Sequence, residues 1–360
     1  MLKKLASTFI FCLSLAFVNG QAVRKYSNEF LAIGVGARAL GMSNAFVSSV
    51  DDVSSGYWNP AGLLRVKGDR QVALMHAEYF AGIAKYDYAA FAAPLDTLST
   101  LGFSFIRFGV DNIPNTTELI DANGNINYDK ISSFSAADYA FIVSYAKRSK
   151  VPGLSIGANT KVVHRIVGEF AKAWGFGLDL GAQYEVENWK FGAMARDITS
   201  TFNAWRYSLD QETIDVFNRT GNTLPQNSIE ITLPKLILGA ARTYNIRKKF
   251  TLLAEADLDF TFDRKRNVLI RSNAVSIDPH MGLELGYGGF VFLRAGFGNI
   301  QQVTDLDKNI STSIQPNMGL GVKIKNITID YALTDIGYQS VALYSNIFSL
   351  KFDINRRKGE

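Results

Sequence analysis

Cysteine is almost absent from this sequence. The only one among 360 residues is Cys12, which lies inside an apolar N-terminal stretch. If that stretch is removed on export, the remaining chain has no cysteine. This excludes disulfide bonds, thiol catalysis and cysteine-ligated metal sites. An exported chain of this length must then be stabilised by its own core or by a membrane.

A second long apolar run is also missing. The run that is present, Leu5–Val18, follows Lys3 and Lys4 and is followed closely by Gly20. This is the pattern of a secretory signal peptide (residues 1–20), and the run is shorter than the ~20 apolar residues of a membrane-spanning helix. If the rest of the chain spans a membrane, it must do so as a closed barrel, which leaves no backbone group unpaired in lipid.

Clustered ligands, catalytic motifs and concentrated charge are missing as well. The formal net charge is +5, and basic residues gather only at the tail, Arg356–Lys358, which is not a nucleic-acid footprint. The three histidines lack metal-ligand spacing, and no Gly-x-Ser-x-Gly motif occurs. We therefore expect no nucleic-acid partner, no catalytic residue, no metal and no cofactor, in a protein that is not an enzyme.

What the sequence does contain is a period of two in hydrophobicity. In Trp174–Glu185 large apolar residues alternate with Gly, Asp, Gln and Glu, and Leu252–Phe262 repeats the pattern with Glu255, Asp257 and Asp259 on its polar face. A soluble sandwich strand also alternates. Here, however, the polar face is rich in Gly and the apolar face often begins or ends in an aromatic residue. That is typical of a lipid-facing exterior with aromatic girdles and a polar lumen.

The alternation recurs along the chain from about residue 71. It predicts strands near 71–77, 84–93, 98–107, 135–146, 154–166, 174–185, 189–197, 235–244, 249–262, 277–287, 289–298, 313–324, 326–334 and 340–354. This makes about fourteen strands, an even number, joined by alternating short and long connections as in outer-membrane barrels. The predicted fold is all-β, a transmembrane antiparallel β-barrel (70–354) with an N-terminal plug or hatch (21–69). A signal peptide (1–20) precedes it and a short basic tail (355–360) follows.

Charged residues on the polar faces are expected to point into the barrel. The acidic ones are Asp179, Glu255, Asp257, Asp259 and Glu284, and the basic ones are Arg196, Arg242, Arg294 and Lys323. They either line a conduction path or form lumenal ion pairs that pin the plug and close the pore. The second interpretation is favoured, because both signs occur in similar number and buried charges persist only when paired.

The plug contains the stretch on which the functional prediction depends most, residues 30–63. Six of its residues are candidates for binding a ligand or partner: Asp51, Asp52, Tyr57, Trp58, Asn59 and Pro60. Asp, Asn and Pro more often cap a helix or set a turn. The adjacent aromatic pair is the more informative feature, because amphipathic rings placed in a plug require packing or recognition.

The predicted connection 198–234 carries many large apolar residues. Phe202, Trp205, Tyr207 and Phe217 are the candidates for partner contact. An external loop of this composition either folds against the barrel mouth or forms an exposed apolar patch for a partner. The sequence leaves both possibilities open.

At the plug the sequence resembles a known family. Gly36–Leu63, GARALGMSNAFVSSVDDVSSGYWNPAGL, is similar to the opening of PorV/PorQ-family outer-membrane proteins, which belong with the FadL-like fatty-acid transporter barrels. The matching elements are the Gly-Ala-Arg-Ala-Leu-Gly-Met run, the pair Asp51-Asp52, and Trp58–Gly62. The resemblance implies a fourteen-stranded barrel with a lumenal hatch. It also implies a noncatalytic part of the type IX secretion system of Bacteroidota, whereas the FadL branch carries long-chain hydrophobic molecules inward.

The resulting hypothesis is an accessory subunit of an envelope protein-export machine in the outer membrane of a Gram-negative bacterium. Its expected partners are a larger outer-membrane protein complex, exported protein cargo and membrane lipids. Two alternatives stay open: a FadL-like transporter of hydrophobic small molecules, and an accessory subunit of another outer-membrane complex such as barrel assembly. We expect a sealed, ion-paired lumen in a partner subunit and an apolar pocket beside the hatch in a transporter.

Overall fold

The computed structural model describes residues 27–120, 124–304, 309–334 and 345–355. The predicted signal peptide lies outside these residues, as do the first residues of the predicted hatch and of the last predicted strand, and nearly all of the predicted basic tail.

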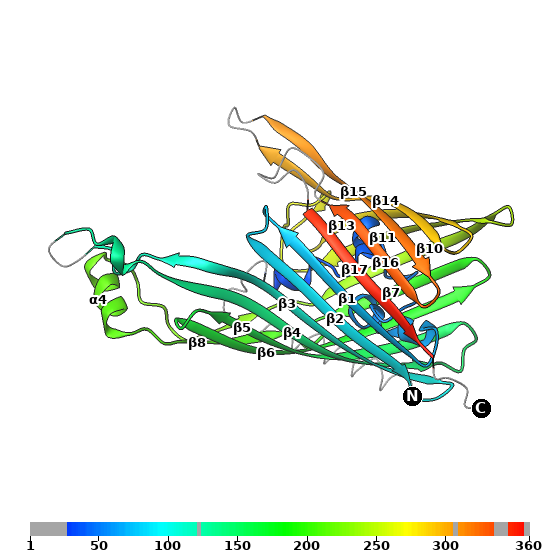
Figure 1. The fold of residues 1–360 in the computed structure, drawn as a ribbon, viewed down its shortest axis with the longest axis horizontal. Coiled ribbons are helices and arrows are strands. Elements are labelled where there is room, and N and C mark those ends of the chain that lie inside the picture. The colour runs from blue at the N-terminus through cyan, green and yellow to red at the C-terminus, as the bar shows by residue number, and fades with distance from the viewer. Residues whose placement is uncertain (1–26, 121–123, 305–308, 335–344, 356–360) are drawn as a thin grey trace.

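Fourteen strands form a closed antiparallel barrel (Figure 1). In chain order they are β1 (Arg70–Tyr79), β2 (Ala84–Pro94), β3 (Ser99–Asn115), β4 (Ser132–Arg148), β5 (Leu154–Val167), β6 (Ala171–Val186), β7 (Trp189–Arg196), β10 (Lys235–Ile246), β11 (Phe250–Thr261), β13 (Ser276–Tyr287), β14 (Val291–Thr304), β15 (Ile310–Ile324), β16 (Ile327–Thr334) and β17 (Ser345–Ile354). Each strand pairs with the next in this order, and β1 also pairs with β17, which closes the sheet. The predicted fold class is confirmed. Closure leaves no strand edge in the membrane.

Paired structure continues past some predicted strand ends, between β3 and β4 and likewise between β14 and β15. β3 and β4 pair as far as Asn115 and Ser132, with a register shift between Val110 and Ile113. The segment between the predicted strands 98–107 and 135–146 is therefore strand at both ends. The backbone N–H and C=O groups beyond the predicted strand ends need hydrogen-bond partners, and the longer hairpin provides these partners.

The predicted connection 198–234 joins β7 to β10 and is itself folded. It holds β8 (Phe202–Tyr207), α4 (Gln211–Arg219) and β9 (Ser228–Ile231). β8 pairs with the end of β6 that the shorter β7 leaves free, and β9 pairs with β8. A further short strand, β12 (Ile270–Arg271), pairs with β13. Figure 1 shows β3 to β6, β8 and α4 reaching out together at the left, at the end we call external.

Side chains in the barrel strands alternate between membrane and lumen. In β6, Trp174 and Tyr184 are exposed on the outside, whereas Asp179 is buried on the inside. The many glycines of the inner face allow the hatch backbone to approach the wall closely. A Cβ atom on Gly296 would lie 2.4 Å from the backbone carbonyl carbon of Met42.

The N-terminal residues fold inside the barrel as the hatch, described here from residue 27 to 69 (Figure 1). It consists of short helical turns: η1 (Glu29–Leu31), α2 (Ala37–Gly41), α3 (Ser55–Trp58) and η2 (Pro60–Arg65). The main core lies between the hatch and the inner wall and includes Phe46, Trp58 and Leu63, each at most 5% exposed. None of the described helices is long and apolar enough to cross a membrane.

Candidate functional site

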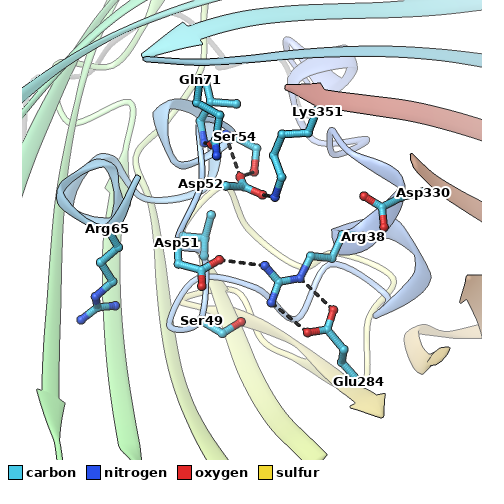
Figure 2. Close-up of polar contacts among 12 residues, drawn as sticks. Arg38, Ser49, Asp51, Asp52, Ser54, Arg65, Gln71, Glu284, Asp330 and Lys351 are labelled. Carbon is cyan, nitrogen blue, oxygen red and sulfur yellow. Dashed lines mark hydrogen bonds and ion pairs between the residues drawn. The ribbon is translucent and has the colours of Figure 1, made fainter. Parts of the chain in front are cut away.

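Arg38 on α2 joins the hatch to the barrel wall (Figure 2). Its Nη1 lies 2.8 Å from Asp51 Oδ1 in the hatch, and its Nε and Nη2 lie 2.8 and 2.9 Å from the two carboxylate oxygens of Glu284 on β13. A bidentate pair fixes orientation as well as distance. Burial lowers the pKa of Arg38, but Glu284 and Asp51 outweigh it and hold this pKa well above its usual value. Arg38 is therefore a permanently charged anchor.

The wall extends this pair into a buried network. Arg294 on β14 places Nε 2.6 Å from Glu284 Oε2 and Nη1 2.7 Å from Asp330 Oδ1 on β16. Both carboxylates and the guanidinium are almost inaccessible. Each of these charges thus has a partner of opposite sign, which is the condition under which buried charges persist. The arrangement favours the interpretation in which lumenal charges pin the plug.

Asp52 makes a second link between hatch and wall (Figure 2). Its Oδ2 lies 2.7 Å from Lys351 Nζ on β17, and its Oδ1 accepts a hydrogen bond from the Ser54 backbone N at 2.9 Å. Burial raises the pKa of Asp52, but Lys351 and Arg38 lower it by more, so this pKa lies well below its usual range. Burial likewise raises the pKa of Asp51, and Arg38 brings it below the ordinary value. Both predicted carboxylates are thus ionised anchors.

The aromatic pair Tyr57 and Trp58 holds the shape of the hatch. The Tyr57 hydroxyl donates to the Leu31 carbonyl at 2.6 Å, and the Arg196 guanidinium lies 4.5 Å from the centre of the Tyr57 ring. Trp58 Nε1 donates to the Val35 carbonyl at 2.9 Å. The rings meet edge to face at 5.0 Å, a favourable geometry. Packing within the chain therefore accounts for both rings, and a role in recognition stays a prediction.

Asn59 and Pro60 seat the hatch against β5 and β6. Asn59 Nδ2 donates to the Ala182 carbonyl at 3.0 Å, and its Oδ1 accepts from the Ala61 backbone N at 3.2 Å as the cap of η2. A Cβ on Gly181 would lie 2.2 Å from Asn59 Oδ1 and 2.8 Å from Pro60 Cδ. The turn is built into the wall, and a ligand-binding role for either residue stays a prediction.

Glu255 and Asp257 on β11 hold the hatch through hydrogen bonds, and neither forms an ion pair with a cation among the described residues. Asp257 Oδ2 accepts from the backbone N atoms of Phe46 and Val47 at 2.7 and 2.9 Å, and Glu255 Oε1 accepts from Ser48 N at 2.7 Å. Hydrogen bonds to a carboxylate are stronger than those between neutral groups. The sequence predicted that these side chains point into the lumen. It could not predict their partners, because every residue type except proline offers the same backbone N–H donor.

Sequence reasoning missed several of the cations that complete the lumenal pairs. Asp179 pairs with Lys161 at 2.8 Å, and Asp259 pairs with Lys235. The prediction that Arg242 points into the barrel is wrong: it shares the outward face of β10 with Leu238 and Tyr244, and its guanidinium lies 5.0 Å from the centre of the Trp189 ring. Alternation indicates which face a side chain occupies, whereas strand register decides which charge lies opposite it.

The four partner-contact candidates lie in folded structure at the external end. Trp205 on β8 is 9% exposed and donates from Nε1 to Glu230 at 2.8 Å. Tyr207 packs beside it and Phe217 on α4 is half-buried, whereas Phe202 is exposed. The segment extends the wall outward, with β8 paired to β6, β9 paired to β8 and α4 at the outer tip (Figure 1), so neither of its two possibilities is decided. Partner contact stays a prediction.

A cavity of about 820 Å³ lies between the external side of the hatch and the wall. Its apolar lining comes from Phe30, Ile33, Leu40, Tyr79, Phe80 and Phe108, and its polar lining includes Lys235, Asp259, Asp278, His280 and Asn317. His280 is held by a hydrogen bond of 2.9 Å between its Nδ1 and the Ser43 carbonyl. The cavity thus has one side suited to apolar groups and one suited to polar groups.

Comparison with known proteins identifies the architecture. The chain has the FadL-like barrel fold. It superposes on the toluene transporter TodX of Pseudomonas putida with a TM-score of 0.56 at 14% identity, over 90% of this chain and 99% of that one. The Ralstonia pickettii toluene transporter TbuX gives 0.54 at 14% identity (89% and 99%), and a Pseudomonas aeruginosa FadL homologue gives 0.50 at 11% identity (89% and 98%).

The two sequence-based comparisons find no relative of this chain. No protein-family model matches the chain, and no match was found among curated proteins. The PorV/PorQ resemblance therefore stays a prediction that rests on Gly36–Leu63.

The outer surface of the FadL-like barrel places it in the outer membrane, as predicted. Large apolar side chains are exposed on strands around the wall, among them Phe141, Leu180, Leu258, Leu293 and Leu320. A closed barrel with such an exterior spans the outer membrane, because lipid covers the apolar side chains and pairing satisfies the backbone.

Proposed function

We propose that this FadL-like barrel takes hydrophobic small molecules from outside the cell into the cavity above the hatch. The cavity carries the proposal. Its volume of about 820 Å³ falls within the ~300–1,000 Å³ of typical ligand sites, and its apolar side is formed by rings and branched chains. Two solved barrels of this fold are described as toluene transporters, which supports the same class of ligand. The protein acts without catalysis.

The test is direct binding to the purified protein in lipid nanodiscs. Radiolabelled toluene and radiolabelled laurate serve as probes, with empty nanodiscs as the background. Ile33→Trp would fill the apolar side of the cavity and is expected to reduce binding at least tenfold. The matched control, Leu74→Trp on the outward face of β1, is expected to leave binding unchanged. Equal counts for protein-containing and empty nanodiscs with both probes would contradict the proposal.

A second candidate is an accessory subunit of an envelope protein-export machine, in line with the PorV/PorQ resemblance. The observation that favours it is the ion-paired hatch. Arg38 with Glu284 and Asp52 with Lys351 fasten the hatch across the lumen, and a barrel closed in this way can act through contacts with other proteins. The partners would be a larger outer-membrane complex and its exported cargo.

Purification from the native membrane separates the two candidates. The tagged protein is extracted in mild detergent, and its proteins and lipids are analysed by mass spectrometry. A stoichiometric large membrane partner without enriched hydrophobic molecules would support the accessory role, and its identity would separate secretion from barrel assembly. A lone barrel that carries a bound hydrophobic molecule would contradict that role and support uptake.

A further inference from the structure

Six ionisable side chains lie on the outward face of β1 to β3, where most of the barrel wall is apolar. They are His76 and Glu78 on β1, Lys85 and Asp87 on β2, and Arg107 and Asp111 on β3, and we call them the outer polar patch. Their side chains are between 25% and 55% exposed. The alternate residues of the same strands, such as Ala77, Tyr86 and Ile106, are buried against the hatch side.

The patch is a continuous network across three strands. His76 Nδ1 lies 2.7 Å from Asp87 Oδ1, and Arg107 lies 3.6 Å from Asp87 and 3.3 Å from Asp111. Lys85 lies 3.6 Å from Asp111. Glu78 Oε1 lies 3.8 Å from His76 Nε2. Every member therefore has an ionisable neighbour within the patch, and both signs remain accessible from outside.

The patch lies within the depth that the membrane covers elsewhere on the barrel. On β6 the outward residues stay apolar from Tyr184 to Trp174. At ~3.3 Å per residue and ~40° strand tilt, this stretch covers about 25 Å along the membrane normal, which is the thickness of the apolar band of such barrels. On β1 the first outward charge above Arg70 is His76, only about 15 Å higher by the same geometry. Lipid tails would meet these charges.

We propose that a second copy of this chain covers the outer polar patch. Two copies cross the same membrane in the same orientation, so their patches lie at the same depth. A two-fold axis along the membrane normal sets β1 of one copy opposite β3 of the other, which brings Glu78 toward Arg107 of the second copy and the reverse. The patch holds both signs, as a self-complementary surface requires. This inference goes beyond uptake or secretion and depends on neither.

Two further features fit a protein surface better than a lipid. Apart from His76, the patch holds three acidic and two basic residues, so it does not suit lipid phosphates. A hollow of about 470 Å³ adjoins Lys85 and Asp111 and is also lined by Ile83, Ile113 and Pro114. Such a hollow can receive an apolar side chain from the facing wall, and Ile83, at the tip between β1 and β2, is 64% exposed.

Crosslinking in the native membrane tests the contact. Cys12 is the only native cysteine and lies in the predicted signal peptide, so single-cysteine variants give clean products. Ala89→Cys lies beside Asp87 on the outward face of β2, and Leu283→Cys on the outward face of β13 is the control. With a short bis-maleimide we expect at least tenfold more product of twice the monomer mass from Ala89→Cys. Equal yields, no product, or a product with a different protein would overturn the proposal.

A charge exchange tests the predicted pairing between copies. Glu78→Arg in the Ala89→Cys background is expected to lower the crosslinked product at least fivefold, and adding Arg107→Glu is expected to restore it. Heat-dependent migration in gels reports that each variant is a folded barrel. If the folded double variant crosslinks no better than the single variant, the two-fold pairing of Glu78 with Arg107 is wrong.

Discussion

At the scale of single residues, the hatch depends most on Arg38. It serves Asp51 in the hatch and Glu284 in the wall at once, so its loss removes the ion-pair partner of Asp51 and one of the two partners of Glu284, which keeps Arg294. The residues singled out from the sequence, Asp51 and Asp52, are therefore one half of a charge arrangement whose other half lies in distant strands.

Replacing Arg38 by Gln is expected to loosen the hatch. Breaking a buried pair by removing one partner costs roughly 3–5 kcal/mol. Hatch release is followed in urea by maleimide labelling of Ser48→Cys, since Ser48 is fully buried. The matched control is Arg65→Gln, whose partner Glu185 is 43% exposed, and for such a pair about 0–1 kcal/mol is expected. Equal urea midpoints for the two variants would contradict the anchoring role of Arg38.

Acid is expected to release the hatch through Asp51 and Asp52. Their pKa values are lowered in the folded protein, so the stabilisation they provide is present above the unfolded value of ~3.9 and is lost as pH falls through the folded values. Labelling of Ser48→Cys after acid exposure, measured across pH 2 to 6, is expected to rise below about pH 4. In Asp52→Asn the hatch should be looser at pH 6 and less sensitive to acid. An unchanged pH profile would exclude Asp52 as the titrating group.

At the scale of elements, the fit between hatch and wall depends on inward glycines of the strands. On β14 a Cβ at Gly296 would lie 2.4 Å from the Met42 carbonyl carbon, and backbone cannot rotate away as a side chain can. This explains why polar faces of the predicted strands contain so much Gly, a feature that alternation alone left without a cause.

Gly296→Leu is expected to prevent the hatch from seating while leaving the barrel closed. The added side chain must displace backbone at Met42, whereas Ala295→Leu on the same strand points outward into lipid and should have no effect. Maleimide labelling of Ser48→Cys without urea is expected to be at least tenfold faster in Gly296→Leu than in Ala295→Leu. Similar rates in the two variants would show that the wall can adapt to a side chain here.

At the scale of the whole molecule, the barrel and the hatch have separate sources of stability. Strand pairing closes the wall from β1 round to β17 without help from the hatch, and the lipid-facing side chains bury themselves in the membrane. The hatch instead depends on wall charges and on close packing against the inner face.

Deleting residues 27–66 is therefore expected to leave an inserted but open barrel. Insertion is measured by heat-dependent migration in gels, and opening by sensitivity of the cells to vancomycin, which an intact outer membrane excludes. We expect normal insertion and at least a fourfold lower inhibitory concentration than with the full chain. Loss of the folded band would mean that the wall needs the hatch in order to close.

Many residues of the candidate site could be predicted from the sequence, because they lie close together in one short segment of the chain. The resemblance at Gly36–Leu63 and the acidic pair Asp51-Asp52 marked the hatch. The partners of that pair were not predictable: Lys351 lies 299 positions from Asp52 and Glu284 lies 246 from Arg38. The outer polar patch was also missed, since His76, Asp87 and Arg107 come together only through strand pairing.

The sequence by itself determined the barrel: the period of two, most strand boundaries to within a few residues, and the lack of a second long apolar run all follow from short-range chemistry, whereas the external ends of β3 and β14 lie well beyond the predicted ones. Only the tertiary structure decided how the hatch is held in the barrel, which charges meet inside it, and where the outer wall is polar. The physical reason is register. A strand's pattern assigns each side chain to a face, but the neighbour across the ladder depends on how strands hundreds of residues apart align when the sheet closes.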